Sequence, residues 1–324
     1  MKNLRIVFMG TPEFAVATLG SLLMNGFNVV GVITAPDRPS GRGRKINKSA
    51  VKEFAEFSQL PIMQPDNLKD PVFIENIKKL KADIFVVVAF RMLPEVVWKI
   101  PVAGAFNLHA SLLPHYRGAA PINHAIINGE TITGVTTFFI DDKIDTGNIL
   151  LREEVHIFPF ENAGDIHDRL MKHGARLVIK TLEGLSENDI KPQPQSQFIK
   201  AGEALKLAPK IFPDDCIINW NNDPVKIHNF IRGLAPYPCS RSILKNDSST
   251  HSFKIFESLP EIAKHTFSPG QIISDGKHFI KVACNDGFIS VVNLQLEGKK
   301  RMNTVEFLRG FIITDYTIPV NLPV

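Results

Sequence analysis

Residues 105–130 read AFNLHASLLPHYRGAAPINHAIINGE, and a short apolar run, IFVVVA, precedes them at residues 84–89. An uninterrupted apolar run of this length is typical of a strand that is buried on both faces, as in a parallel sheet. Side chains alternate between the two faces of an extended segment, so Asn107 and His109 share one face. The stretch therefore predicts a strand end that presents an amide and an imidazole, followed by a loop shaped by prolines and glycine.

The N-terminal residues predict a strand, a helix and a second strand. Residues 4–9 (LRIVFM) and 29–33 (VVGVI) have strand patterns, and the residues between them carry a helical apolar stripe that ends at Asn25-Gly26. Such a unit within about 33 residues gives two parallel strands. Gly10 is not followed by GxGxxG, so this turn does not indicate dinucleotide binding.

Further elements extend this pattern to a first domain at residues 1–185. We expect helices at 51–60 and 65–80, strands at 134–140 and 149–157, and a helix that Asn162 or Asp165 caps and that runs to residue 185. Residues 186–206 contain Pro192 and Pro194 among polar residues and predict a partly extended linker. The first domain is therefore expected to be α/β.

Residues 207–324 have a different pattern, dominated by short strands. Strands are predicted at 217–220, 252–256, 270–273, 278–283 and 288–294, with one short helix at 224–232. Many short strands separated by turn signals indicate a small β-barrel or sandwich. We therefore expect a second, β-rich domain over residues 207–324.

Composition narrows the class of protein. A chain of 324 residues is long enough for two domains of roughly 100–200 residues each. Neither a signal peptide nor the roughly 18 apolar residues of a membrane helix is apparent, so we expect no membrane association. The three cysteines lack a CxxC pair, which fits a reducing, cytoplasmic location better than a disulfide framework. A net charge of +4 means that any nucleic acid must bind at local patches.

One such patch is the polar segment at residues 34–51, TAPDRPSGRGRKINKSAV, which has no periodicity. Its basic residues are Arg38, Arg42, Arg44, Lys45 and Lys48, with no acidic residue between them. Composition alone allows two interpretations. The segment is either a solvated surface loop or a basic finger that binds phosphates and becomes ordered on binding.

A carboxylate completes a polar group with Asn107 and His109. Asp145 follows the predicted strand at 134–140, and open parallel sheets bind ligands at the carboxyl ends of their strands. Each of the three residues alone is more often structural, but together an amide and an imidazole can hold an oxyanion while a carboxylate orients the imidazole or relays a proton. Ser111 lacks a nucleophile elbow, and the histidines lack zinc-site spacing, so we expect no metal. This inventory allows acyl or formyl transfer to an external nucleophile.

Eight segments together resemble the folate-dependent formyltransferases, and in particular the members of that family that act on tRNA. They are FMGTPEFAV at 8–16, DRPSGRGRK at 37–45, VVVAFRMLP at 86–94, FNLHASLLPHYRGAAPINHAI at 106–126, DTGNIL at 145–150, IRGLAPYP at 231–238, and LQLEGKKRM with EFLRG near the C-terminus. The matches run nearly end to end. The resemblance implies a Rossmann-like first domain with a parallel-rich sheet and an OB-like β-barrel as the second domain.

The resemblance also implies a reaction, the transfer of the formyl group of 10-formyltetrahydrofolate to the α-amino group of methionyl initiator tRNA. It assigns catalysis to Asn107, His109 and Asp145. It assigns folate binding to Ser111, Leu112, Leu113 and Pro114, with Phe90 and Met92 on the pteridine side. It assigns tRNA binding to the basic segment (Arg38, Arg42, Arg44, Lys45, Lys48), with the loop around Arg42 at the acceptor stem, and to Lys299, Lys300 and Arg301. We expect a monomer.

The chain departs from the family pattern at two places. Phe90-Arg91 stands where the family usually has Tyr-Gly, which leaves the effect of Arg91 on the folate pocket open. His115-Tyr116 stands where Arg-Trp is common. Both departures keep an aromatic residue.

Other interpretations account for less of the chain. A formyltransferase for a nucleotide-sugar amine would share the catalytic residues but has less use for the basic segment. A glycinamide-ribonucleotide formyltransferase would leave the second domain unexplained, and a formyltetrahydrofolate hydrolase needs neither basic patch. A non-catalytic RNA-binding protein would use the barrel and would not depend on His109.

Overall fold

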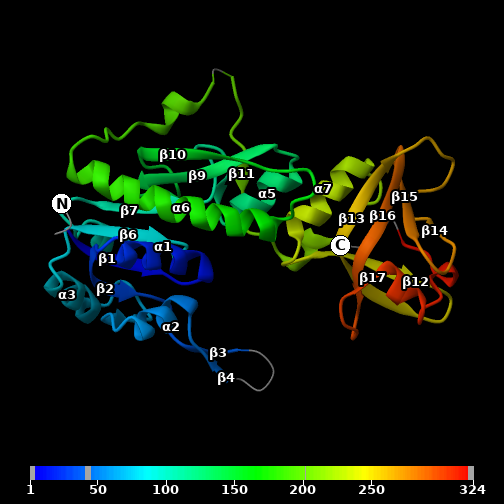
Figure 1. Ribbon diagram of the computed structural model, residues 1–324, viewed down its shortest axis with the longest axis horizontal. Helices are drawn as coiled ribbons and strands as arrows, with labels where there is room; N and C mark the ends of the chain where they lie inside the picture. The colour runs from blue at the N-terminus through cyan, green and yellow to red at the C-terminus, as the bar shows by residue number, and fades with distance from the viewer. Residues whose placement is uncertain (1–3, 41–44, 201, 320–324) are drawn as a thin grey trace. The chain divides into compact units, whose positions relative to one another are not determined.

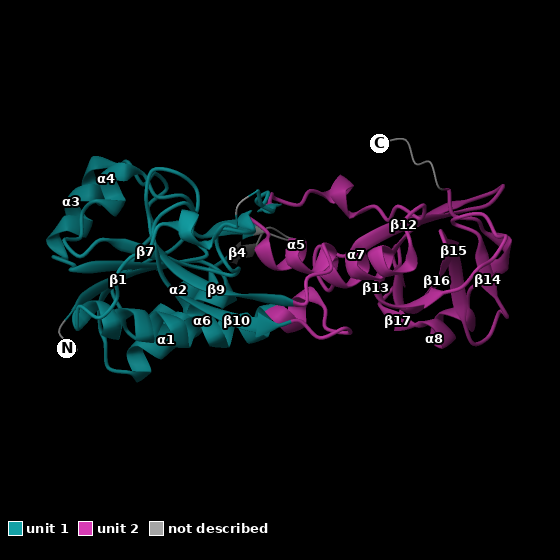
Figure 2. Ribbon diagram, turned by 90° about the horizontal axis from the view of Figure 1, so that it is seen from above, with its two compact units in different colours: residues 1–118, 132–156, 167–207 teal, residues 119–131, 157–166, 208–324 magenta. Residues whose placement is uncertain are grey.

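The computed structural model describes residues 4–40, 45–200 and 202–319 (Figure 1). The chain forms two compact units. Unit 1 contains residues 1–118, 132–156 and 167–207, and unit 2 contains residues 119–131, 157–166 and 208–324 (Figure 2). The predicted domain boundaries at residues 185 and 207 stay a prediction. The structure adds that two short internal segments belong with the C-terminal part of the chain.

Unit 1 is built on a seven-stranded sheet with the order β10-β9-β7-β6-β1-β2-β5. The strands are β1 (Arg5–Gly10), β2 (Asn28–Ile33), β5 (Ile62–Met63), β6 (Ile84–Val88), β7 (Ala105–His109), β9 (Ile132–Phe139) and β10 (Ile149–His156). Neighbours from β7 to β5 pair in parallel, whereas β9 and β10 are antiparallel. This confirms the expected Rossmann-like, parallel-rich fold.

Three of the five helices described in this part of the chain, α2 (Ala50–Phe57), α3 (Pro71–Lys79) and α6 (Ala163–Ser186), begin at a residue whose side chain caps them. The other two are α1 (Glu13–Met24) and α4 (Glu95–Trp98). At the start of α6, Asn162 Oδ1 accepts from the backbone N–H of Gly164 at 2.8 Å, and Asp165 Oδ2 accepts from the N–H of Asn162 at 2.9 Å. These reciprocal bonds satisfy N–H groups that the helix leaves unpaired. The predicted capped helix is confirmed.

The core of unit 1 lies on both faces of the sheet. Every residue of β6 is buried, as the apolar run predicted. On one face, Phe85 packs in a cluster with Phe73 of α3 and Val97 of α4. Burying a large apolar side chain contributes about 1.5–3 kcal/mol before the entropy of ordering is counted. This core fixes β7, the neighbour of β6.

The basic segment, which the sequence predicts to be an aperiodic loop, is partly a β-hairpin in the structure. It contains a short antiparallel pair, β3 (Arg38–Ser40) and β4 (Lys45–Asn47). The base of the pair is tied to α2, because Lys48 Nζ lies 2.7 Å from a carboxylate oxygen of Glu56. Residues 41–44, including Arg42 and Arg44, lie outside the described residues.

The segment predicted to be a linker is packed rather than free. It contains a 3₁₀ helix, η1 (Gln195–Phe198). Just before it, the backbone groups of Gln193 and Ile149 exchange two hydrogen bonds of 2.8 Å. The segment therefore runs along the exposed edge of β10, where unpaired backbone groups are available.

Unit 2 contains a six-stranded antiparallel sheet, consistent with the expected OB-like fold. Its strands are β12 (Ser240–Lys245), β13 (Thr250–Ile262), β14 (Ile272–Ser274), β15 (Ile280–Cys284), β16 (Gly287–Leu296) and β17 (Met302–Asn303), and its helices are α5 (Pro121–Ile127), α7 (Pro224–Leu234) and α8 (Thr304–Leu308). A two-residue pair, β8 (Arg117–Gly118) with β11 (Leu207–Ala208), and the 3₁₀ turns η2 (Pro213–Cys216) and η3 (Ile313–Asp315) complete the described elements.

The strand predicted at residues 217–220 is wrong. These residues make only an isolated bridge between Ile217 and Arg241. Trp220 is fully buried in the core of unit 2, and its Nε1 donates to Ser242 Oγ at 3.0 Å. Apolar residues here fill a core without joining the sheet. No helix among the described ranges has the length and apolar character to cross a membrane.

Candidate active site

Strand β7 presents Asn107 and His109 on one face of the sheet. Asn107 pairs with Phe138 and His109 with Thr136 across the antiparallel ladder to β9. The opposite face carries α6, because Thr137, the partner of Leu108, makes a 2.8 Å hydroxyl–hydroxyl hydrogen bond with Thr181 of that helix. The helix thus covers one face, and Asn107 and His109 share the other face with Ala105, which packs in the core cluster formed with α3 and α4.

A backbone carbonyl fixes the ring of His109, which is 7% exposed. The Nε2 atom lies 2.8 Å from the carbonyl oxygen of Tyr116. Because a carbonyl can only accept, Nε2 must carry a hydrogen and donate it. The other nitrogen, Nδ1, faces Asp145 Oδ2 at 3.8 Å. That distance is too long for a direct hydrogen bond.

Asp145 reaches His109 by a different route from the one predicted. Strand β9 is antiparallel to β7, so its carboxyl end lies beside the amino end of β7 and not beside His109. The prediction of two strands ending at one edge is therefore wrong. The loop at residues 140–148 instead brings the carboxylate back, and Oδ2 accepts from the N–H of Gly118 at 3.0 Å.

Two residues that the sequence did not single out hold this loop. Gln195 is 4% exposed, and its amide nitrogen donates to the carbonyl oxygens of Asp145 and Gly147, both at 2.9 Å. Its amide oxygen accepts from Arg117 Nε at 3.0 Å and Nη2 at 2.6 Å. Burial lowers the pKa of Arg117, and the nearby carboxylate of Asp145 opposes that shift.

The SLLP segment forms a tightly bonded loop beside β9. Ser111 Oγ donates to the carbonyl of His115 at 2.7 Å, and Thr136 Oγ1 donates to the carbonyl of Ser111 at 2.7 Å. The N–H of Leu113 donates to the same Thr136 oxygen at 3.2 Å. Among the predicted folate residues, Ser111, Leu113 and Pro114 are buried, whereas Leu112 is partly exposed.

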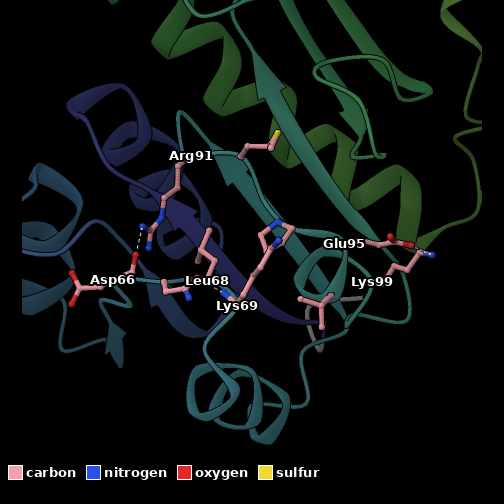
Figure 3. Close-up of a pocket in the computed structure, with 10 residues that line it drawn as sticks. Asp66, Leu68, Lys69, Arg91, Glu95 and Lys99 are labelled. Atoms are coloured by element: carbon pink, nitrogen blue, oxygen red, sulfur yellow. Dashed lines mark hydrogen bonds and ion pairs between the residues drawn. The ribbon is translucent and has the colours of Figure 1, made fainter.

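A recess of about 950 Å³ lies between residues 66–69 and residues 91–99 of unit 1 (Figure 3). Its lining residues are Asp66, Asn67, Leu68, Lys69, Arg91, Met92, Pro94, Glu95, Val96 and Lys99. Met92 was predicted to contact folate, and Phe90 beside it packs against the core. Arg91 donates to the carbonyl of Asp66 at 2.8 Å and also to the carbonyl of Pro65. Arg91 thereby joins the two sides of the recess. Asn107, His109 and Asp145 do not line it.

The predicted basic residues fall in both units. In unit 1, Arg38 is exposed on β3, Lys48 is paired with Glu56, and Lys45 is described only as backbone of β4. In unit 2, three exposed residues, Lys299, Lys300 and Arg301, lie between β16 and β17. The guanidinium carbon of Arg301 lies 4.5 Å from the centre of the Phe256 ring. An aromatic face at this distance can hold a cation.

Comparisons with known proteins agree with this architecture. The chain matches the family Formyl transferase over residues 4–182 and the family Formyl transferase, C-terminal domain, over residues 210–312. A methionyl-tRNA formyltransferase of Bacteroides fragilis is 53% identical over 97% of both chains. Another, from Flavobacterium johnsoniae, is 51% identical over 97% of this chain and 98% of its own.

Solved structures share the fold at lower identity. An N-formyltransferase from Helicobacter canadensis, in complex with folinic acid and dTDP-3-aminofucose, superposes with a TM-score of 0.64 at 21% identity, over 92% of this chain and 100% of that one. HypX from Aquifex aeolicus, in complex with tetrahydrofolic acid, gives 0.62 at 18% identity, over 95% of this chain and 48% of that one. From the sequence matches over both of its units, this chain belongs to the formyl transferase family.

Proposed function

We propose that the chain transfers the formyl group of 10-formyltetrahydrofolate to the α-amino group of methionyl initiator tRNA, in translation initiation. The observation that carries this proposal is the 53% identity, over nearly the whole of both chains, to a protein named methionyl-tRNA formyltransferase. The polar group on β7 and the loop at residues 140–148 supports the same chemistry. We further propose that the enzyme acts as a cytoplasmic monomer.

The proposed reaction needs an oxyanion site, and Asn107 and His109 supply its donors. The amine attacks the formyl carbon, a new C–N bond forms, and the carbonyl electron pair moves onto oxygen. The amide of Asn107 and the Nδ1–H of a protonated His109 donate to that oxygen. Tyr116 accepts from Nε2 at 2.8 Å, so Nδ1 is the nitrogen that faces the reaction. Oxyanion donors of this kind are each worth about 10²–10³ in rate.

Asp145 is proposed to move the proton. Its carboxylate lies 3.8 Å from His109 Nδ1, the nitrogen that faces the reaction, and it would accept the proton of the attacking amine there. The same proton then goes to N10 of the folate as the C–N10 bond breaks and the oxyanion electron pair re-forms the carbonyl. The Tyr116 carbonyl, and not Asp145 as the sequence suggested, orients the imidazole ring in this scheme.

The formyl donor is proposed to be a folate that lies along the SLLP loop and the wall formed by Phe90 and Met92. Because Ser111, Leu113 and Pro114 are buried, the loop would meet this substrate through its backbone and Leu112. Met92 is 74% exposed and lines the 950 Å³ recess. That volume lies within the roughly 300–1,000 Å³ of ordinary ligand pockets.

Recognition of tRNA is proposed to depend on phosphates. Arg38 and Lys48, with Arg42, Arg44 and Lys45 of the same segment, would bind the acceptor stem, and Lys299, Lys300 and Arg301 would bind elsewhere on the tRNA. Among the members of this set whose side chains the structure describes, Lys48 would exchange a carboxylate partner, Glu56, for a phosphate. The lysines and arginines would position the tRNA without reading its sequence.

The experiment that tests the proposal compares formyl transfer to charged initiator methionyl-tRNA with transfer to charged elongator methionyl-tRNA. We expect formylation of the initiator that requires 10-formyltetrahydrofolate and fails with His109→Ala. Transfer to a nucleotide-sugar amine in place of tRNA, or tRNA binding without any transfer, would contradict the proposal.

A further inference from the structure

Gln195 is a buried side chain in a segment that is otherwise largely exposed. It lies at the start of η1, and its neighbours Gln193 and Gln197 are both exposed. Its amide makes four hydrogen bonds of 2.6–3.0 Å, using both the nitrogen and the oxygen. An amide nitrogen has two donor hydrogens, so the two carbonyl oxygens that it reaches use its full donor capacity.

The partners of Gln195 belong to the two loops that carry the candidate catalytic groups. On the nitrogen side, it binds the carbonyls of Asp145 itself and of Gly147. On the oxygen side, it binds Arg117. Arg117 stands between Tyr116, whose carbonyl holds the His109 ring, and Gly118, whose N–H holds the Asp145 carboxylate. One side chain therefore joins both sides of the His109–Asp145 pair.

We infer that Gln195 is a positioning residue that sets the separation between the Asp145 carboxylate and the His109 ring. This inference rests on the proposed function, because it assigns Gln195 to the same reaction. Gln195 touches neither reacting atom and acts through the loops.

The conformation of Asp145 explains why such a residue is needed. Asp145 has a φ of +54°, in the left-handed region that non-glycine residues adopt at a cost. Such a conformation persists only where the surroundings hold it. The two backbone bonds between Gln193 and Ile149 fix the base of the segment, so Gln195 meets the loop from a fixed position.

Two substitutions distinguish the hydrogen bonds that the amide nitrogen of Gln195 donates from those that its oxygen accepts. Gln195→Met removes all four bonds at similar side-chain length. Gln195→Glu keeps an acceptor for Arg117 but places an oxygen against the carbonyls of Asp145 and Gly147. Gln197→Met is the matched control, since it makes the same change at an exposed position of the same short helix.

We expect both Gln195 variants to lower kcat by about 10- to 100-fold, because a misplacement of about 1 Å can cost about 100-fold in rate. KM for both substrates should stay within about twofold of wild type, since the affected groups act on the reacting atoms. Gln197→Met should match the wild type. In an Asp145→Asn background, Gln195→Met should have little further effect, because residues that act through one another are not additive.

A spectroscopic readout separates positioning from a purely structural role. The backbone N–H of Gly118 donates to the Asp145 carboxylate, so its proton shift in an NMR spectrum of the full chain reports the position of that carboxylate. We expect this resonance to move in both Gln195 variants and to stay in place in Gln197→Met, at unchanged melting temperature.

Three results would overturn the inference: activity of a folded Gln195→Met or Gln195→Glu equal to that of Gln197→Met, a lower kcat with an unmoved Gly118 resonance, or full additivity with Asp145→Asn. If Gln195→Met does not fold, Gln195→Glu provides the same comparison. A wild-type protein that transfers no formyl group would contradict the proposed function alone, and the Gly118 resonance would still test the position of Asp145.

Discussion

Strand β7 and the loop at residues 140–148 hold the two halves of one site in different ways. β7 lies between β6 and β9, and backbone ladders fix Asn107 along both edges and His109 along the edge shared with β9. The loop lies outside the paired strands, and side-chain bonds to Gln195 and the N–H of Gly118 hold Asp145. The strand half shares the stability of the sheet, whereas the loop half depends on a few contacts. Substitutions should therefore disturb the loop half without unfolding the sheet.

The largest expected effect comes from removing the reacting groups themselves. Asn107→Ala and His109→Ala should each lower kcat by about 10²–10³, as the loss of an oxyanion donor typically does, and Asp145→Ala should lower it by about 10²–10⁴, the usual contribution of a general acid or base. The affinity for the formyl donor should change little, because these side chains contact the reacting atoms. Steady-state kinetics with titration of the donor by calorimetry checks both values. Near-normal turnover in any variant would remove that residue from the mechanism.

The next largest effect on kcat is expected from a substitution in the loop at residues 140–148 that leaves strand β7 unchanged. A Cβ added to Gly147 would lie 1.7 Å from the carbonyl oxygen of Phe139, so Gly147→Ala must shift the loop. We expect kcat to fall by about 10- to 100-fold because the carboxylate is displaced. Far-ultraviolet circular dichroism should be unchanged, since β7 is held by its own ladders.

The control for this prediction is Gly310→Ala. No atom lies within 4 Å of a Cβ built at Gly310, so the same chemical change meets open space. Its kcat should equal that of the wild type. A Gly147→Ala protein with full activity would show that the loop tolerates displacement, and the contrast between strand and loop would then be lost.

The strand and the loop also differ in how far their roles could be predicted from the sequence. The strand half was predictable because a period of two assigns Asn107 and His109 to one face from local sequence alone. The partners of the loop half were not. Gln195 lies 50 residues from Asp145 along the chain, and nothing in the sequence distinguishes it from Gln193 or Gln197. Only the pairing of its segment with β10 turns this one side chain inward.

The direction of β9 is a second feature that could not be predicted from the local sequence. The residues between β7 and β9 are numerous enough for the crossover of about a dozen residues that parallel strands need, so length did not exclude a parallel pair. The strand itself was correctly predicted at residues 134–140. Its antiparallel pairing, and with it the route of Asp145, depends on contacts made after the strand forms. Trp220 is a similar case, since core contacts hold it without a ladder.

A smaller effect, on the free energy of unfolding, is expected where the hydroxyl of Thr136 joins strand β9 to the SLLP loop. Thr136 of β9 bonds the carbonyl of Ser111 and the N–H of Leu113, and all of these groups are buried. Thr136→Val keeps the shape and leaves both backbone groups unpaired, which should cost about 1–3 kcal/mol of unfolding free energy. Urea unfolding measures this loss. Thr317→Val, at an exposed threonine, is the control, and an equal stability of the two variants would mean that water replaces the lost bonds.

The smallest expected effect is on the pH dependence of stability, and it concerns a buried histidine, His228, that has no role in the proposed reaction. His228 in unit 2 is 8% exposed, with Ser258 Oγ at 3.1 Å from Nδ1 and the Pro159 carbonyl oxygen at 3.5 Å from Nε2. A neutral ring that accepts from the hydroxyl and donates to the carbonyl satisfies both partners. Burial lowers the pKa of His228 from its ordinary value of 6.5, and the charge of Arg232 lowers it further.

The sign of the pH dependence follows from this shift. As pH falls below 6.5, the unfolded chain binds a proton at His228 that the folded chain does not, so the unfolding free energy falls. His228→Asn should therefore flatten the change in unfolding free energy between about pH 7.5 and about pH 5.5 relative to the wild type. Denaturant unfolding across this range measures the slopes. Equal slopes for the wild type and His228→Asn would mean that the ring binds its proton equally well in the folded and the unfolded chain, so that its burial does not contribute to the pH dependence of stability.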